Sequence, residues 1–457
     1  MTSHSNILQL IGNTPLVSLR RMDTGCCELL VKLESHNPGG SIKDRIGRSM
    51  IEAAEQAGAV GPGSTLVEAT AGNTGLGLAL VAAQKGYRLI LVIPDKMSQE
   101  KVFHLKALGT EVVMTRSDVG RGHPDYYQDL AERISRETPG AYYINQFGNP
   151  ANPLAHETTT GPEIWAQADE RVDAVVCGVG SGGTLTGLGR FFARVAPAVE
   201  MVLADPIGSI LAGYIQTGEI GEAGSWLVEG IGEDFIPPIA DLSRVRAAFS
   251  IGDAESLNTA RELLRNEGIL AGSSSGTLVA AALRYCREQT EPKRVVTLIC
   301  DSGNKYLSKM YNDYWMADQG LRRTQVYGDL RDLIPRRFAD GAVVSVGPDE
   351  PLAVAYKRMR LYDVSQLPVV DDQKIVGIVD ESDLLLAVSA DAQGFSQPVR
   401  RFMSSNLETV PRTARLEQLQ PIFEAGRVAI VADAAGFHGL ITRVDVLNHL
   451  RRRQLAA

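Results

Sequence analysis

The stretch DAVVCGVGSGG, residues 173–183, decides the fold, because an apolar run in it leads directly into closely spaced glycines. This order predicts a buried strand that ends in a tight loop and continues into a helix. Similar β-branched runs occur at 88–94, 110–115, 200–205 and 294–301, with alanine- and leucine-rich helical segments between them. The alternation predicts an open α/β fold whose parallel strands are covered by helices on both faces.

A different pattern occurs twice near the C-terminus. GIVDESD at 377–383 and GLITRVD at 439–445 repeat a glycine and an aspartate at the same spacing. Each lies within the order strand, helix, strand pair, helix, so we expect two copies related by a pseudo-two-fold axis. We predict a first domain over 1–325, a linker over 326–339 and repeats over 340–395 and 396–457.

The bulk composition excludes several classes of protein. A net charge of −8 argues against nucleic acid as the main partner. No apolar run is long enough to span a bilayer, and the N-terminal residues lack the basic and apolar regions of a signal peptide. The five cysteines form no CxxC pair and no cluster with histidine, which is typical of reduced cytoplasmic thiols. We therefore expect a cytoplasmic protein with no structural metal site and no membrane partner.

The glycine loop GVGSGG at 178–183 fits two kinds of phosphate site. It matches G-x-G-x-x-G, and Asp205 ends the next strand, as a ribose-binding acid would in a nicotinamide enzyme. Alternatively, its backbone N–H groups and the hydroxyls of Ser181 and Thr184 bind a single phosphate at the helix N-terminus. Walker-type ATP binding is not favoured, because no Lys-Ser/Thr pair follows the loop.

Two other loops place polar groups at predicted helix starts. Thr70, Asn73 and Thr74 offer hydroxyls and an amide that suit a carboxylate, although helix capping explains them equally well. AGSSSG at 271–276 presents three serines where a single serine would suffice as a cap. Lys43 in NPGGSIKDR also stands at a predicted helix start, where the helix dipole favours a neutral amine.

Lys43 by itself is consistent with a phosphate clamp, a covalent catalyst or a solvated surface charge. Combined with a phosphate loop, a carboxylate loop and a serine-rich loop, it forms a coherent set. Pyridoxal phosphate needs an imine-forming lysine, a phosphate cup and a partner for its ring nitrogen. A dehydrogenase would use the glycine loop but would leave Lys43 and the other two loops without a role.

Five motifs in this order resemble the fold-type II pyridoxal-phosphate enzymes of the β-substitution group, which are the cysteine synthases and cystathionine β-synthases. They are IGNTPLVSL (11–19), NPGGSIKDR (37–45), AGNTG (71–75), GSGGT (180–184) and SSSG (273–276). The resemblance implies a catalytic domain of two open α/β subdomains and bound pyridoxal 5′-phosphate.

Other segments are more similar to cystathionine β-synthases than to cysteine synthases. They are QFGNPANPLAHETTTGPEIW (146–165), DPIGSIL (205–211) and VEGIGEDFIP (228–237). The duplicated tail is similar to a tandem CBS-domain module, which many cystathionine β-synthases carry. The resemblance implies condensation of L-serine with L-homocysteine to L-cystathionine and water, with hydrogen-sulfide-producing side reactions, by a homodimer or a higher homo-oligomer. The alternatives are an O-acetylserine-using cysteine synthase and a non-catalytic scaffold that senses adenosyl nucleotides.

The resemblance also implies a role for each matching residue. Lys43 would form the Schiff base, Asn73 would bond the 3′-oxygen of the cofactor, and Ser274 would face its ring nitrogen. The cofactor phosphate would be held by Gly180, Ser181, Gly182, Gly183 and Thr184. The substrate side would be formed by Thr70, Ala71, Thr74 and Gln146 around the carboxylate and by Gly230 at the entrance for the second substrate.

Three features depart from the family pattern. Ala71 replaces the serine that is usual in the carboxylate loop, and so offers a backbone N–H but no hydroxyl. Glu233 stands where animal enzymes usually have tyrosine, so contacts with homocysteine are expected to differ. The chain starts almost directly at ILQLIGNTPL, without the heme-binding extension of the animal enzymes, and we therefore expect no heme.

The C-terminal repeats carry a separate expectation. CBS-domain pairs bind adenosyl nucleotides through a hydroxyl residue and an aspartate, which contact the ribose. Thr442 and Asp445 match this spacing, whereas the first repeat has Asp380 at the hydroxyl position beside Asp383. An adenosyl effector without a phosphate, such as S-adenosylmethionine, would suit that charge. The alternative is a purely structural dimerisation module.

Overall fold

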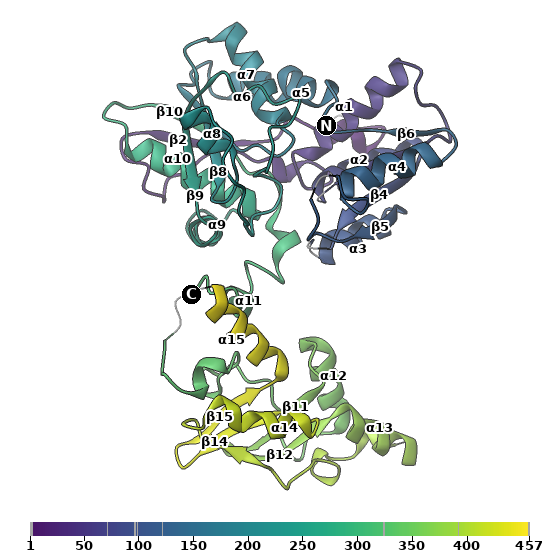
Figure 1. Ribbon diagram of the computed structural model, residues 1–457, viewed down its shortest axis with the longest axis vertical. Helices are drawn as coiled ribbons and strands as arrows, with labels where there is room; N and C mark the ends of the chain where they lie inside the picture. The colour runs from purple at the N-terminus through teal and green to yellow at the C-terminus, as the bar shows by residue number, and fades with distance from the viewer. Residues whose placement is uncertain are drawn as a thin grey trace. The chain divides into compact units, whose positions relative to one another are not determined.

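The computed structural model describes residues 3–70, 72–95, 97, 99–120, 122–322, 325–391 and 393–455. The chain folds into two compact units, Met1–Tyr311 and Asn312–Ala457 (Figure 1). The observed division therefore comes earlier in the chain than the limit at residue 325 that the sequence predicts. No helix among the described residues is both long and apolar enough to cross a membrane.

Side-chain contacts explain why helix α11 (Asp313–Asp318) belongs to the second unit. The guanidinium of Arg336 lies 5.2 Å from the centre of the Tyr314 ring. Arg451 is 3.4 Å from the carboxylate of Asp318. These contacts join α11 to segments much later in the chain.

The first unit contains two β-sheets. The larger sheet has the strand order β1-β2-β10-β7-β8-β9, and the smaller one has the order β5-β4-β3-β6. Every pairing is parallel except β1 with β2. The strands are β1 (Leu16–Ser18), β2 (Glu28–Lys32), β3 (Thr65–Ala69), β4 (Arg88–Pro94), β5 (Glu111–Thr115), β6 (Ala141–Tyr143), β7 (Ala174–Cys177), β8 (Glu200–Pro206), β9 (Val245–Ile251) and β10 (Arg294–Leu298). The predicted α/β architecture and its five named strands are confirmed.

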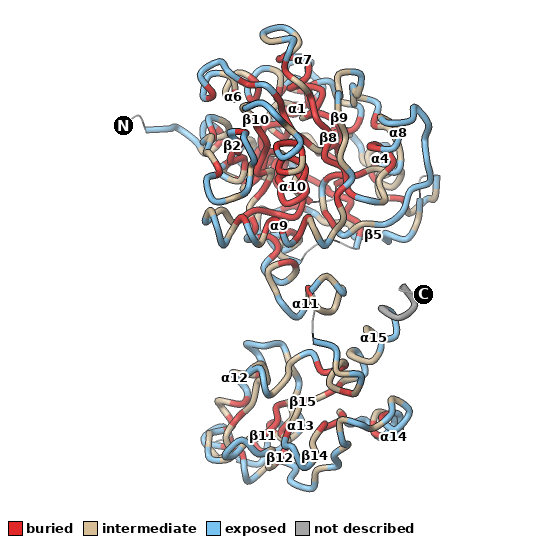
Figure 2. The backbone as a smooth tube through the Cα atoms, turned by 90° about the vertical axis from the view of Figure 1, so that its left-hand side faces the viewer, coloured by how far each residue is buried: buried red, intermediate tan, exposed pale blue. Residues whose placement is uncertain are grey.

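Helices cover both sheets of the first unit. They are α1 (Lys43–Gln56), α2 (Asn73–Lys85), α3 (Gln99–Ala107), α4 (Tyr127–Glu137), α5 (Ala151–Ala155), α6 (Gly161–Gln167), α7 (Gly183–Val195), α8 (Leu211–Thr217), α9 (Asp253–Glu267) and α10 (Ser273–Arg287). Helix α10 lies against β10 and β8, and Figure 2 shows the buried residues of this unit concentrated around the strands and α10.

The smaller sheet shows how strand alternation builds two cores. Leu66 of β3 packs with Ile46 of α1 and Leu78 of α2 on one face. Val67, the next residue, packs with Ala131 of α4 on the opposite face. Because successive side chains of a strand point to opposite faces, an apolar run along β3 fills both cores.

The second unit repeats one arrangement, as the sequence predicts, except that the strand expected at the start of the first repeat is reduced to a single bridge between Val346 and Val369. An antiparallel strand pair is followed by a helix in each half, and each pair shifts register at matching points, Val369/Val370 and Val431/Ala432. The first half contains α12 (Leu352–Tyr362), β11 (Gln366–Asp371), β12 (Lys374–Asp380) and α13 (Glu381–Ala390). The second half contains β13 (Thr409–Val410), α14 (Gln420–Glu424), β14 (Ala429–Asp433), β15 (Gly436–Ile441) and α15 (Arg443–Leu455).

The segment 326–339, which we expected to be a linker, takes part in a core. Leu330, Leu333 and Ile334 are buried with apolar residues of the second repeat, among them Leu419. Spacing of i, i+3 and i+4 places these three side chains on one face of a helical turn. The polar residues between them made the segment look like a solvated connection.

Candidate active site

Lys43 is the first residue of helix α1 and is half-buried. Its backbone N–H donates to the hydroxyl of Ser41 at 3.3 Å, which orders the turn before the helix. Burial lowers the pKa of the Lys43 amine, and the neighbouring Cys300 and Asp301 oppose this shift without cancelling it. A lysine in this position reaches its neutral, nucleophilic form more readily than a solvated lysine does.

Ser274 and Lys43 both lie close to the thiol of Cys300, although they are far apart in the sequence. Burial raises the pKa of the Cys300 thiol to about 12, while the Lys43 charge and a hydrogen bond with Ser274 act in the opposite direction. Cys300 follows strand β10, and Ser274 lies in the first turn of α10. The fold thus brings the predicted imine-forming lysine and the predicted ring-nitrogen partner to the carboxyl end of one strand.

The predicted phosphate loop lies between β7 and α7. Helix α7, which follows the loop, has no side-chain cap at its N-terminus, so its first N–H groups are left for a ligand at the positive end of the helix dipole. The hydroxyl of Ser181 accepts from Nδ2 of Asn152 at 2.9 Å, and Oγ1 of Thr184 lies 3.3 Å from Nε2 of His156. Both hydroxyls are therefore held in defined positions beside the loop backbone.

Close packing behind this loop requires glycine. A Cβ atom on Gly183 would lie 1.9 Å from Oδ1 of Asn152, and one on Gly180 would lie 2.6 Å from the carbonyl oxygen of Gly230. The backbone of Gly232 also donates to the carbonyl of Val179 at 2.8 Å. The segment predicted to line the second-substrate entrance therefore packs directly against the phosphate loop.

Two sets of hydrogen bonds order the predicted carboxylate loop at the start of α2. Oγ1 of Thr70 accepts from the N–H groups of Gly72 and Gly75 at 3.1 and 3.3 Å. Oγ1 of Thr74 donates to Oε1 of Gln146 at 2.7 Å. Ala71, the remaining predicted member, lies outside the described residues.

Asn152 connects the two loops, and our sequence reasoning did not find it. Its Nδ2 donates to the carbonyl of Gln146 at 2.8 Å as well as to Ser181. Asn152 is 1% exposed, so these bonds are shielded from water. No local pattern distinguishes it, because its partners lie on other segments of the chain.

A buried set of charged residues at the site was also missed. Nζ of Lys101 is 2.6 Å from Glu229, and Lys309 is 2.8 Å from the same carboxylate. Burial alone would raise the pKa of Glu229, but the two lysines hold it below its ordinary value. Asp301, which accepts a hydrogen bond from Asn73 at 2.8 Å, comes three residues after the end of strand β10. Its place at a carboxyl strand end was a usable signal, since ligands of α/β sheets bind there.

Thr442 and Asp445 lie in the second unit and bond to each other. The carboxylate of Asp445 accepts from the backbone N–H of Thr442 at 2.6 Å and from its hydroxyl at 2.7 Å. In the first repeat, Asp380 and Asp383 form a capping box at the start of α13. Each of these two pairs thus organises the start of a helix in this structure.

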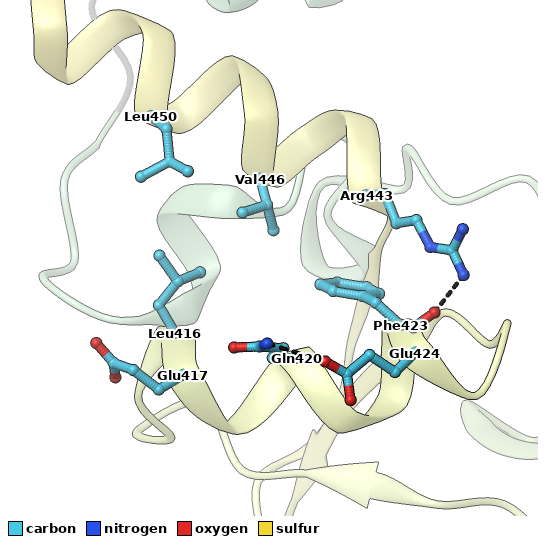
Figure 3. Close-up of a pocket in the computed structure, with 8 residues that line it drawn as sticks. All are labelled: Leu416, Glu417, Gln420, Phe423, Glu424, Arg443, Val446 and Leu450. Atoms are coloured by element: carbon cyan, nitrogen blue, oxygen red, sulfur yellow. Dashed lines mark hydrogen bonds between the residues drawn. The ribbon is translucent and has the colours of Figure 1, made fainter.

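An open groove of about 660 Å³ lies beside α15 in the same unit (Figure 3). Apolar side chains of Phe423, Val446 and Leu450 line it together with charged residues, including Glu424. Arg443 at one end donates to the carbonyl of Phe423.

The described residues contain no group of three or more histidine, cysteine or acidic side chains that could hold a metal ion.

The donor set of the first unit fits pyridoxal phosphate. It offers an uncapped helix N-terminus with two positioned hydroxyls for a phosphate, a lysine of lowered pKa and a neutral serine nearby. A family model described as pyridoxal-phosphate dependent enzyme matches residues 7–301, and CBS-domain models match residues 331–390 and 399–452. The protein is therefore a pyridoxal-phosphate-dependent enzyme with two CBS domains.

Full-length relatives narrow the class further. The chain is 36% identical to a cystathionine β-synthase of Dictyostelium discoideum, covering 98% of this chain and 93% of the relative. It is 38% identical to a cystathionine β-synthase of Oryctolagus cuniculus, covering 98% and 85%. A solved O-acetylserine-dependent cystathionine β-synthase from Helicobacter pylori is 35% identical with a TM-score of 0.63, covering 68% of this chain and 99% of that one. The chain belongs to the cystathionine β-synthase family.

Proposed function

We propose that this enzyme condenses L-serine with L-homocysteine to give L-cystathionine and water, as a step of transsulfuration and cysteine biosynthesis. Full-length similarity to cystathionine β-synthases, including the CBS-domain tail, carries the proposal. The buried groups around Lys43 support it, because they suit a reaction that removes and returns a proton at one carbon.

Pyridoxal phosphate, when bound, supplies an electron sink that stabilises negative charge at the α-carbon of an amino-acid substrate. Lys43 then needs two properties. Its Nζ would hold the cofactor covalently, and the same amine would accept the α-proton of the substrate. The lowered pKa of Lys43 serves both, because a neutral amine attacks a carbonyl and accepts a proton.

Ser274 influences which reaction follows removal of the proton. A neutral hydroxyl near Lys43 and Cys300 gives weaker support to a positive ring nitrogen than a carboxylate would. Weaker withdrawal of electrons into the ring favours rapid loss of the β-hydroxyl over side reactions at the α-carbon. Burial and the charges of Lys43 and Arg45 hold the pKa of His156 well below its ordinary value, so its imidazole is neutral and adds no positive charge near Lys43.

Substrate binding is assigned to groups that are already fixed. Thr74 and Gln146 bond each other, and Gln146 also donates to the carbonyl of Ala69 at 3.0 Å. The Gln146 amide keeps a second N–H, and a donor that is already fixed binds a carboxylate without the entropy cost of ordering a flexible side chain. We assign the entrance of homocysteine to Gly230 and neighbouring residues, including Glu233, whose carboxylate lies 4.0 Å from where a Cβ on Gly180 would be.

The choice of the first substrate is tested by comparing kcat/KM for two reactions. We expect serine with homocysteine to exceed O-acetylserine with sulfide, and this order should hold at saturating cofactor. The reverse order would make the enzyme a cysteine synthase in practice. Cystathionine formed faster from O-acetylserine than from serine would place it with the Helicobacter pylori enzyme.

We further propose that the CBS-domain pair binds an adenosyl effector at Thr442 and Asp445. Tandem CBS-domain matches support this assignment. Titration calorimetry with S-adenosylmethionine should detect binding to the wild type and weaker binding to D445A. Heat from neither protein would favour a structural role for the repeats.

We also propose a cytoplasmic homodimer, in keeping with the family resemblance and the five free cysteines.

A further inference from the structure

The side-chain amide of Asn73 is held from both ends by charged groups. Its Oδ1 accepts from Nζ of Lys305 at 3.0 Å. Its Nδ2 donates to Oδ2 of Asp301 at 2.8 Å. Asp301 is 0% exposed and Lys305 is 7% exposed, so water competes little for these bonds.

The chemistry of the two partners fixes which way the amide points. A lysine ammonium only donates, so the atom facing Lys305 must be the carbonyl oxygen of Asn73. An ionised carboxylate only accepts, so the atom facing Asp301 must be the amide nitrogen. An amide nitrogen carries two hydrogens and Asp301 takes one, which leaves one N–H of Asn73 for another acceptor.

Both partners are themselves held in place. Nζ of Lys305 also donates to the carbonyls of Gly39 and Gly40, at 3.1 and 3.3 Å, in the turn that precedes Lys43. Oδ2 of Asp301 also accepts from the hydroxyl of Tyr306 at 2.7 Å. Lys305 therefore joins the turn before the proposed catalytic lysine to the amide of Asn73.

We propose that Asp301 and Lys305 are positioning residues for the cofactor, because together they orient Asn73 so that its remaining N–H points to the 3′-oxygen of pyridoxal phosphate. This inference rests on the proposed function only for the identity of the cofactor. Sequence resemblance assigned Asn73 alone, and the two charged residues follow from the geometry. Without them the amide could rotate and present its carbonyl oxygen to an oxygen of the cofactor, which repels it.

The main test replaces Lys305 by methionine, which keeps the length of the side chain but removes its donors. Apoprotein is titrated with pyridoxal phosphate, and the visible spectrum of the loaded protein is recorded at one fixed pH. We expect cofactor affinity to fall about tenfold and the band at about 410 nm to lose intensity relative to absorbance at shorter wavelength. K305R, which restores donors, should recover most of both signals.

A double-mutant cycle separates positioning from general stability. Lys305→Met is introduced into Asn73→Ala, where no amide remains to be oriented, and D301N is measured in both backgrounds. We expect Lys305→Met to change the spectrum with Asn73 present and to add less than about a twofold change in affinity without it. Equal effects in the two backgrounds, or no spectral change in either, would overturn the proposal.

The measurement needs no amino-acid substrate, so its outcome is independent of whether serine and homocysteine are the correct pair. If Lys305→Met proves insoluble, K305Q provides a polar replacement of similar size. Its expected spectrum lies between those of wild type and the methionine variant. A wild-type spectrum for K305Q together with a wild-type cofactor affinity would also contradict the proposal.

Discussion

Replacing Gly183 by alanine adds one carbon atom, the Cβ, beside the proposed phosphate site. A Cβ on Gly183 would lie 1.9 Å from Oδ1 of Asn152, whereas ordinary contact begins at 3.4 Å. The Asn152 amide must therefore move by at least about 1.5 Å, which is 3.4 minus 1.9. A shift of that size exceeds the tolerance of a hydrogen bond.

The structure sets the magnitude of the loss. Nδ2 of Asn152 donates to the carbonyl of Gln146 at 2.8 Å and to the hydroxyl of Ser181 at 2.9 Å. Each buried group that loses its partner costs about 1–3 kcal/mol, so two lost bonds cost about 2–4 kcal/mol when partial relaxation is allowed. When this whole free energy is lost from cofactor binding, the dissociation constant of pyridoxal phosphate rises by about 30-fold to about 1,000-fold.

Apoprotein titrated with pyridoxal phosphate gives the dissociation constant, and the urea midpoint of the apoprotein reports the part of the loss expressed as stability. G189A is the matched control in the same helix, because a Cβ there meets only the Arg244 side chain at 3.7 Å. We expect this control to stabilise the protein by about 0.5–1 kcal/mol and to leave cofactor affinity unchanged. Wild-type affinity together with a wild-type midpoint for G183A would refute the reasoning.

Three further substitutions test other parts of the account. K43A should lose the band at about 410 nm and all exchange of the serine α-proton with solvent deuterium; exchange that persists would remove Lys43 as the base. Burial raises the pKa of Glu68 from 4.5 to about 8, so this carboxyl contributes stability below pH 4.5 that is lost as the pH rises through about 8. E68Q should therefore show a flatter dependence of the urea midpoint on pH over that window, and a wild-type slope would contradict the assignment. D445A removes the acceptor for Thr442 at the start of α15 and should lower the stability of the second unit by about 1 kcal/mol in thermal unfolding, with no change in the cofactor spectrum.

Local sequence was sufficient to predict much of the fold. The apolar run that became β4 and the glycine loop that opens α7 are patterns within about ten residues, and they appear where they were expected. The linker was harder, because Leu330, Leu333 and Ile334 form only a short apolar set within a polar segment, and they are buried against residues far along the chain, including Leu419. Local polarity does not report such long-range packing.

The residues of the candidate site also differ in how well local sequence identifies them. Asn73 directly follows Gly72 and Lys43 comes three residues after Gly40, both at helix starts, so their surroundings in the sequence point to them. Asn152 and Lys305 were not singled out, because their roles depend on partners on other segments of the chain, Ser181 and Asn73. A buried charged group needs a partner, and only the folded chain shows which residue supplies it. Asp445 bonds the hydroxyl of Thr442 at the start of α15 in the structure, whereas ligand binding there stays a prediction.

The central claim is the reaction itself, and mass spectrometry of its product tests it most directly. Purified holoenzyme is mixed with serine labelled at the β-carbon and with unlabelled homocysteine. The account predicts labelled cystathionine, formed with loss of one water per turnover, and no product from K43A. No labelled cystathionine, from protein that converts O-acetylserine and sulfide to cysteine, would contradict the account.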